Sequence, residues 1–166
     1  VRLVTLTGPG GSGKTRLSLQ AAAAAADDYD RGVWWVPLAS LADPALVATA
    51  AAQALGSKDT LSATVGDKRL LLVLDNFEHL IEAAAGVAET IGSCPHLTVL
   101  VTSREPLHVD GEWEVAVDPL RVRDAVDLFV QRALAVNSDF AANGEVAQIC
   151  RRLDCLPLAI ELAAAR

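Results

Sequence analysis

A glycine-rich run near the start of the chain has residue types that could bind phosphate. The run GPGGSGKT, residues 8–15, matches the pattern G-x-x-x-x-G-K-[ST]. Its glycines allow successive backbone N–H groups to turn inward around phosphate oxygens. Lys14 can then reach the β- and γ-phosphates of a nucleotide, and the Thr15 hydroxyl can ligate Mg²⁺. We call this run the glycine loop. Its candidate binding residues are Gly8, Pro9, Gly10, Gly11, Ser12, Gly13, Lys14 and Thr15, with Arg16 directly after it.

The neighbouring sequence decides between two interpretations of the glycine loop. A tight turn that only joins a strand to a helix would have a similar composition. The apolar residues 2–7 predict a short strand before the loop, and residues 14–26 predict a helix after it. This strand–loop–helix order is the context that the phosphate-binding pattern requires, and it places phosphate at the positive end of a helix. We therefore expect phosphate binding.

A second run, RLLLVLDN, supplies a candidate for the other half of a magnesium site. Residues 69–75 predict a strand without alternation, as expected when both faces of a parallel sheet are covered. Asp75 ends this strand, where it is well placed to hold Mg²⁺ through water opposite Thr15. The alternative role for Asp75 is to cap a helix that begins at Phe77. The complete glycine loop favours the metal role.

The residues after Asp75 predict weak hydrolysis. Many ATPases with a glycine loop carry a second acid at the position of Asn76, and an amide can orient water but cannot take its proton. Glu78 is the nearest carboxylate that could act as the base, and it could equally be a first-turn acid favoured by the helix dipole. His79 is expected to be a surface or capping residue.

Arg104 follows the predicted fourth strand in the run VTSRE. The carboxyl ends of parallel strands converge on the ligand crevice, so Arg104 could contact the γ-phosphate, with hydroxyl contacts added by Thr102 and Ser103. A solvated loop arginine is the alternative, and the residues alone leave the two equal. The candidate catalytic residues are thus Lys14, Asp75, Glu78 and Arg104.

The remaining pattern predicts an α/β fold with a parallel sheet covered by helices on both faces. Further strands are expected at residues 33–38, 97–103 and 113–117, further helices at 44–55 and 77–91, and a polar connection at 57–67. Only helical periodicity follows, at 122–136, at 144–153 and from Pro157, a good first-turn residue. We expect a nucleotide-binding domain over residues 1–120 and the start of a helical subdomain over 121–166.

Composition narrows the classes of function and location. The net charge is −7 and no basic cluster occurs, which argues against direct nucleic-acid contact by this segment. No apolar run approaches the ~20 residues of a membrane span, and an odd count of three cysteines fits a reducing cytoplasm. The chain lacks an initial methionine and a signal peptide, and its first residues already read as a strand. We therefore expect an excerpt of a longer protein.

Together these motifs resemble the NB-ARC type of STAND ATPase, and within it the bacterial branch found in LuxR-like and AfsR/SARP-like transcriptional regulators. The resemblance rests on GPGGSGKTRL, LLLVLDNFEHL, VLVTSRE, VDPL and CLPLAIELAAA. It implies a five-stranded sheet of order 5-1-4-3-2, Arg104 as a sensor beside the glycine loop, and Pro157 as a nucleotide contact. It also implies an ATP/ADP switch with slow Mg²⁺-dependent hydrolysis, fused sensor and output domains, and homo-oligomer formation on activation.

The sequence departs from this family at one motif and leaves two other functions open. Cys155 stands where the family usually has glycine, so the turn before Pro157 must form without glycine's freedom. One alternative function is a dedicated phosphotransferase or motor ATPase, although no arginine-rich lid or acceptor-binding acid is evident. The other is a nucleotide-independent adaptor, against which Lys14, Thr15 and Asp75 argue.

Overall fold

The computed structural model describes residues 1–165 and divides into two compact units. The first, named here the α/β unit, comprises Val1–Gly8 and Lys14–Ala116. The second, the helical unit, comprises Pro9–Gly13 and the chain from Val117 onward. The middle of the glycine loop is thus grouped with the helical unit, while both of its ends belong to the α/β unit. The boundary expected near Leu120 stays a prediction about domain organisation.

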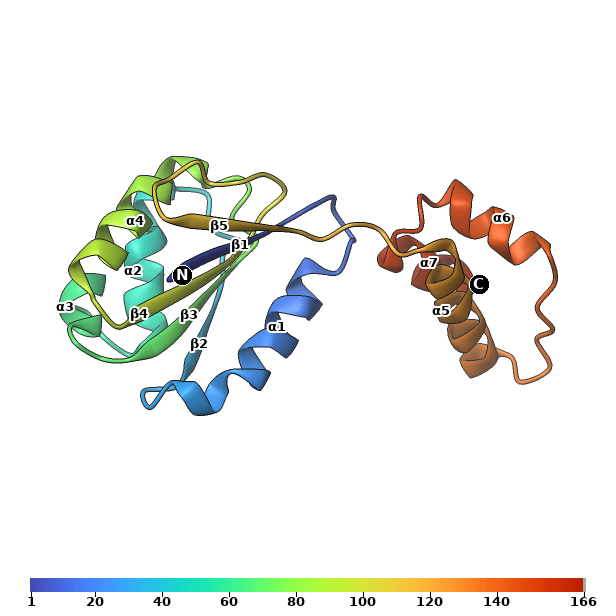
Figure 1. Cartoon of the computed structure of the whole chain (residues 1–166), viewed down its shortest axis with the longest axis horizontal. Coiled ribbons are helices and arrows are strands. Elements are labelled where there is room, and N and C mark those ends of the chain that lie inside the picture. Colours follow the sequence, from blue (N-terminus) through green and yellow to red (C-terminus); the bar gives the residue numbers. More distant parts are fainter. Residues whose placement is uncertain (166) are drawn as a thin grey trace. The chain divides into compact units, whose positions relative to one another are not determined.

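A five-stranded parallel sheet forms the centre of the α/β unit (Figure 1). Its order is β2-β3-β4-β1-β5, which confirms the order 5-1-4-3-2 expected from the resemblance. Parallel pairing places Leu6 of β1 beside Thr102 of β4, and Leu74 of β3 beside Val101. The carboxyl ends of β1, β3 and β4 therefore meet at one edge of the sheet. The strands are β1 (Leu3–Thr7), β2 (Val33–Pro37), β3 (Leu70–Asp75), β4 (Leu97–Thr102) and β5 (Glu112–Ala116).

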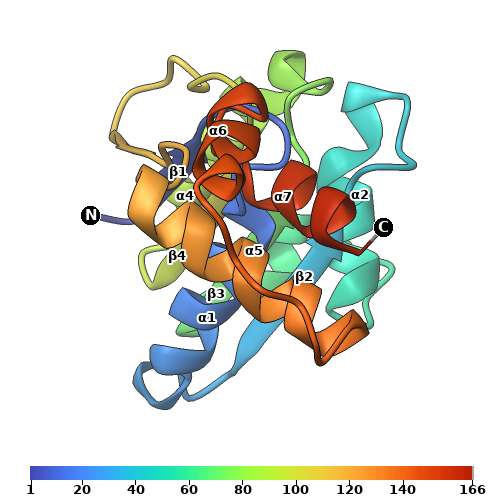
Figure 2. The same ribbon diagram turned by 90° about the vertical axis from the view of Figure 1, so that its right-hand side faces the viewer.

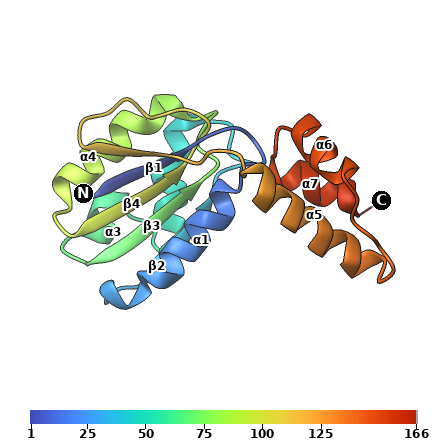
Figure 3. The same cartoon turned by 45° about the vertical axis from the view of Figure 1, so that its right-hand side comes forward.

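Both faces of the sheet are covered by helices, as the unbroken apolar run of β3 predicts. Side chains alternate along a strand, so that Leu70, Leu72 and Leu74 join the main core, in which residues of α2, α3 and α4 also lie. Leu71 and Val73 are buried on the other face, where α1 contacts β3 and β4 (Figures 1 and 3). The helices are α1 (Lys14–Ala24), α2 (Val47–Ala54), α3 (Leu61–Val65) and α4 (Ala84–Ser93).

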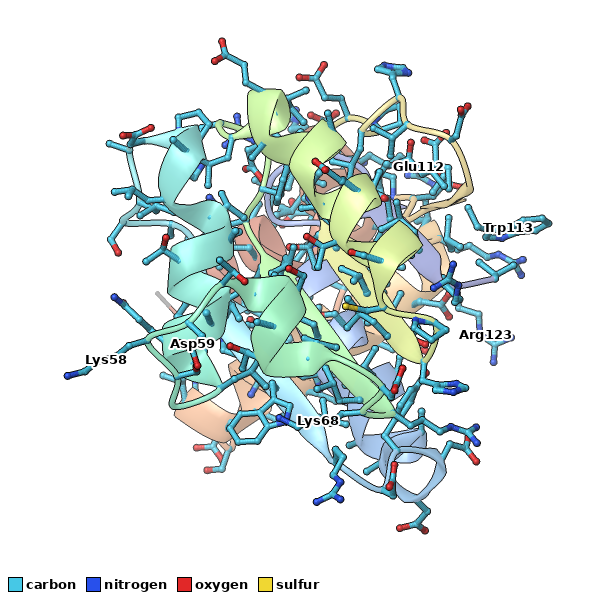
Figure 4. The ribbon with its side chains drawn as sticks, turned by 90° about the vertical axis from the view of Figure 1, so that its left-hand side faces the viewer. Lys58, Asp59, Lys68, Glu112, Trp113 and Arg123 are labelled. Carbon is cyan, nitrogen blue, oxygen red and sulfur yellow. The ribbon has the colours of Figure 1, made fainter. Side chains whose placement is uncertain are left out.

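The β5 edge of the sheet is more exposed than the centre. Trp113 pairs with Val4 of β1, yet its side chain points away from the ribbon and is 59% exposed (Figure 4). The carboxylate of Glu112 accepts the N–H groups of Leu107 and His108, and so closes the loop before β5. Short strands at an edge are one way in which proteins limit unwanted strand pairing.

Two expectations about local structure are wrong. The polar connection at residues 57–67 contains α3, because the Thr60 hydroxyl accepts the Ala63 N–H and caps a five-residue helix. The helix expected at residues 77–91 begins later: Ile81–Ala83 form a 3-10 turn, and the α-helix starts only at Ala84. The chain between Asp75 and this turn is irregular, since Asn76 adopts the left-handed φ of 69°. A 3-10 turn at Pro44–Leu46 likewise precedes α2, and another at Ala26–Asp28 follows α1.

The helical unit has a core of its own, formed where α5 contacts α6 and α7 (Figure 2). Its helices are α5 (Val122–Val136), α6 (Glu145–Arg152) and α7 (Pro157–Ala164). Phe129 and Phe140 pack with ring centroids 6.0 Å apart, and Arg132 pairs with Glu161 at 2.7 Å. The turn before Pro157 does form without glycine, because Asp154 and Cys155 take left-handed φ values of 52° and 53°. The core residues are Ala125, Phe129, Ala133, Val146, Cys150, Cys155, Ile160 and Ala164.

Candidate nucleotide site

The glycine loop connects the end of β1 to the first residue of α1. Gly11 and Gly13 adopt φ values of 79° and 96°, a region that L side chains rarely enter. A Cβ at Gly13 would meet no atom within 4 Å, so the backbone conformation, not space, requires glycine there. The Ser12 N–H donates to the Pro9 carbonyl at 3.2 Å and tightens the middle of the loop. The glycine loop is therefore a turn in which other residues at positions 11 and 13 would be strained.

Lys14 is the buried cation of the site. Its side chain is 9% exposed, and Nζ donates to the Gly8 carbonyl at 2.7 Å, which joins the two ends of the loop. Burial lowers the pKa of Lys14 from its ordinary value of 10.5, Glu78 and Asp75 raise it, and Arg104 lowers it. Lys14 thus shares one electrostatic environment with the other three residues predicted to be catalytic.

Ser12 provides a test of whether a phosphate fits the loop. Its hydroxyl Oγ is buried and has no hydrogen-bond partner among the described residues. A buried hydroxyl without a partner costs free energy, and such groups call for a specific explanation. A phosphate oxygen accepts hydrogen bonds and would satisfy this donor. The residues present therefore fit a bound phosphate group.

Asp75 and Thr15 are brought together as the magnesium hypothesis requires. The Thr15 hydroxyl donates to Asp75 Oδ1 at 2.8 Å, from the first turn of α1 to the end of β3. The capping alternative for Asp75 is wrong, because no helix begins at Phe77. No cluster of three or more His, Cys, Asp or Glu side chains suited to a metal occurs within residues 1–165. One carboxylate and one hydroxyl would suffice for Mg²⁺, which usually keeps several waters and binds substrate phosphates.

Glu78 and Arg104 form an ion pair beside this centre. Arg104 Nε donates to Glu78 Oε1 at 3.0 Å. The Arg104 side chain is 67% exposed, whereas that of Glu78 is 17% exposed. Glu78 precedes the first helical turn, so its alternative role as a first-turn acid is wrong. The sensor role of Arg104 stays a prediction, and the structure adds that its side chain contacts the candidate base.

An open pocket of about 620 Å³ lies over these residues, within the α/β unit. It is lined by Asn76, Glu78, His79, Arg104 and Glu105. His79 is exposed and its Nε2 lies 2.7 Å from the Leu41 carbonyl, which fits the surface role expected for it. A nucleophilic water would have space here, with the Asn76 amide and the Glu78 carboxylate as neighbours.

Arg16, the candidate binding residue directly after the glycine loop, is exposed in the first turn of α1.

The helical unit brings the middle of the glycine loop to the start of α7. The Leu158 N–H donates to the Gly11 carbonyl at 3.3 Å. A Cβ at Gly11 would lie 3.1 Å from the Leu158 Cβ, so this approach also depends on glycine. Pro157 is the first residue of α7. Its contact with nucleotide stays a prediction.

Sequence relatives of this chain occur in mycobacteria. An uncharacterized protein of Mycobacterium tuberculosis is 48% identical over 179 residues, which cover 99% of this chain and 46% of the relative. A candidate HTH-type transcriptional regulator of the same species is 46% identical over 179 residues, covering 99% of this chain and 20% of the relative. The chain thus spans less than half the length of either relative. No known family model matches it.

Solved structures with a similar fold include a STAND protein and Cdc6p. A STAND protein with a tetratricopeptide repeat sensor from Pyrococcus horikoshii superposes with a TM-score of 0.62 at 16% identity, over 98% of this chain and 27% of that one. Cdc6p from Pyrobaculum aerophilum gives 0.63 at 16% identity, over 98% and 52%. The five-stranded parallel sheet and its strand order match such neighbours. The fold is that of the P-loop NTPases.

Sequence reasoning missed one part of this candidate site. Thr102 was expected to offer a hydroxyl to nucleotide, but its hydroxyl donates to Asp75 Oδ1 at 2.6 Å and accepts the Asn76 N–H at 2.9 Å. A polar residue at the end of an otherwise apolar strand was the available signal. It did not identify the partner, because strand neighbours are not encoded in local spacing.

No helix in residues 1–165 is long and apolar enough to cross a membrane.

Proposed function

We propose that this segment is an ATP/ADP-binding switch module with slow Mg²⁺-dependent hydrolysis, which regulates output domains fused to it. One observation carries the proposal: Lys14 lies within the glycine loop and the Thr15 hydroxyl meets Asp75 at 2.8 Å, where they could bind phosphate and Mg²⁺, while the residue after Asp75 is an amide. The first feature favours tight binding, and the second disfavours rapid turnover. This combination suits a protein that holds its nucleotide for long periods.

Each residue of the site has a separate task in this proposal. The loop N–H groups and the Ser12 hydroxyl would bind phosphate oxygens, and Lys14 would neutralise the β- and γ-phosphates. Thr15 and Asp75 would hold Mg²⁺, which supplies charge neutralisation at the phosphates. Asn76 would orient a water and Glu78 would accept its proton. Arg104 would leave Glu78 for the γ-phosphate and so report its presence.

The relatives support the regulatory part of the proposal. One is described as a candidate HTH-type transcriptional regulator, and this chain matches a fifth of its length. The similar archaeal protein carries a tetratricopeptide repeat sensor on a STAND ATPase. A switch module joined to sensor and output domains in the cytoplasm, with homo-oligomer formation when active, is the arrangement that we propose for the whole protein. The NB-ARC branch remains our proposed assignment within the STAND class.

A thermal-shift comparison tests nucleotide binding. The melting temperature of the full-length protein should rise on addition of Mg-ATP or Mg-ADP, because a ligand that binds only the folded state stabilises it. The Lys14→Ala variant should lose this shift. Equal shifts in both proteins would refute the assignment of the glycine loop as a phosphate-binding site. Single-turnover hydrolysis should be far below the enzyme median of ~10 per second, whereas a rate near that median would favour a dedicated phosphotransferase or motor ATPase.

A further inference from the structure

Thr102 lies at the centre of the site without facing the pocket. It is the last residue of β4 and is 1% exposed. Its hydroxyl donates one hydrogen bond, to Asp75 Oδ1 at 2.6 Å, and accepts one, from the Asn76 N–H at 2.9 Å. Both partners belong to the chain that leaves the neighbouring strand β3. The hydroxyl therefore joins two strands at the edge where the ligand is expected.

The bond to Asp75 determines how its carboxylate is turned. Asp75 Oδ1 also accepts the Thr15 hydroxyl at 2.8 Å, so two hydroxyls from different elements converge on one oxygen. A terminal carboxylate torsion is broad and is fixed only by its partners. Of the two donors, Thr15 is itself a proposed magnesium ligand, whereas Thr102 is buried in the sheet. Thr102 can hold the carboxylate in place whether or not the ligand is present.

The bond to Asn76 determines where the chain goes after Asp75. Asn76 has a φ of 69°, in the left-handed region that residues other than glycine uncommonly enter. The Thr102 hydroxyl accepts its N–H, and the Thr102 carbonyl accepts the Phe77 N–H at 2.9 Å. The two bonds hold the turn that carries Glu78 toward Arg104. Strained backbone of this kind persists only where the surroundings determine it.

We propose that Thr102 is a positioning residue of this site, which acts through Asp75 and Asn76 and contacts neither nucleotide nor metal. The proposal rests on the proposed function, since it assigns Asp75 to magnesium. Partners that orient metal-holding carboxylates commonly change metal affinity by about ten- to a hundredfold when they are removed. Loss of the Thr102 hydroxyl should therefore weaken the binding of Mg²⁺ together with nucleotide while leaving metal-free nucleotide binding unchanged.

Two substitutions separate the hydroxyl from the packing of the side chain. Thr102→Val keeps the shape but removes the hydroxyl, and Thr102→Ser keeps the hydroxyl. Amide hydrogen exchange of the nucleotide-free protein gives the first measurement. In Thr102→Val the Asn76 amide should exchange faster, whereas the Phe77 amide should stay protected because its acceptor is the Thr102 backbone. Unchanged exchange at Asn76 would overturn the proposal. Should Thr102→Val fail to fold, Thr102→Ala takes its place.

A magnesium titration of the full-length protein gives the second measurement. The Mg²⁺ concentration for half of the ATP-induced melting shift should rise about tenfold or more in Thr102→Val, and Thr102→Ser should behave as wild type. ATP binding in EDTA should be equal in all three proteins. Equal magnesium dependence in wild type and Thr102→Val would overturn the positioning role alone. No shift in the wild type with ATP and Mg²⁺ would refute the proposed function, and the positioning role with it.

Discussion

Arg104 Nε donates to Glu78 Oε1 at 3.0 Å, so the candidate sensor and the candidate base form an ion pair. The pair joins the loop after β4 to the turn after β3. Arg104 is the more exposed partner, which leaves its guanidinium accessible to a phosphate. Because exposed ion pairs contribute little to stability, the pair can exchange partners at small cost. A phosphate that binds Arg104 could thereby release Glu78 from the ion pair.

Substitution of Glu78 tests its role as the base. Glu78→Gln can still accept the Arg104 Nε–H but cannot take a proton, so hydrolysis should fall by at least the ~10²-fold typical of general-base catalysis. Binding of Mg-ATP, followed by melting temperature, should be retained. Glu105→Gln is the matched control, since Glu105 lines the same open pocket. Turnover that is unchanged in Glu78→Gln would show that another group activates the water.

Substitution of Arg104 tests its role as the sensor. Arg104→Ala should bind ADP as the wild type does and lose the discrimination between ATP and ADP, because only ATP offers the γ-phosphate that the guanidinium would contact. Calorimetric titration with each nucleotide measures the ratio of affinities. Arg123→Ala, which changes an exposed arginine of α5 (Figure 4), controls for lost surface charge. A ratio that does not differ from wild type would count against the sensor assignment.

The lowered pKa of Lys14 predicts the direction in which stability changes with pH. Burial lowers the pKa of Lys14 below 10.5, its ordinary value, so the unfolded chain binds more protons than the folded one between the lowered pKa and 10.5. The contribution of Lys14 to the free energy of unfolding should therefore rise with pH in this window. Denaturant unfolding of wild type and Lys14→Met, at several pH values up to 10.5, measures the difference. A difference that falls with pH would contradict the assignment of burial as the main cause.

The backbone conformation and charge of Asp154 predict that its replacement stabilises the helical unit. Asp154 follows Leu153, the C-cap of α6, with a φ of 52°, and its carboxylate is near the negative end of that helix. Asp154→Gly removes both costs and should raise the free energy of unfolding by about 0.5–1 kcal/mol, after the entropy of glycine in the unfolded chain is subtracted. Asp154→Asn removes only the charge and should give a smaller gain. Lower stability of Asp154→Gly in denaturant unfolding would argue against this conformation.

The strands could be predicted from sequence because their apolar runs are continuous and lie between turn residues. The short helix α3 could not, since five residues with Ser and Thr carry too little periodicity, and the Thr60 cap alone is weak evidence. The late start of α4 was missed for a different reason. Asn76 leaves the helical conformation through bonds to Thr102, which is distant in sequence, so no local pattern could indicate them.

The chemistry of the site was predictable to a similar extent. The types and spacing in the glycine loop indicate phosphate binding directly, and Asp75 follows from its place at the end of an apolar strand. The neighbours of these residues depend on the strand order, which the residues alone left open. The contact of Arg104 with Glu78 and the contact of Thr102 with Asp75 both require β3 and β4 to be adjacent. Long-range pairing, not composition, determines which polar groups meet.

The position of β1 between β4 and β5 has a consequence for synthesis on the ribosome. Of the five strands β1 is made first, yet both of its partners come from the far end of the α/β unit, as Leu3 pairs with Val99 and Glu112. Pairing between such distant segments is slow, and it leaves an apolar strand uncovered in the meantime. The strand that precedes the glycine loop therefore gains both of its neighbours only after β5 has emerged. A nascent chain that stalls before this point should depend on chaperones.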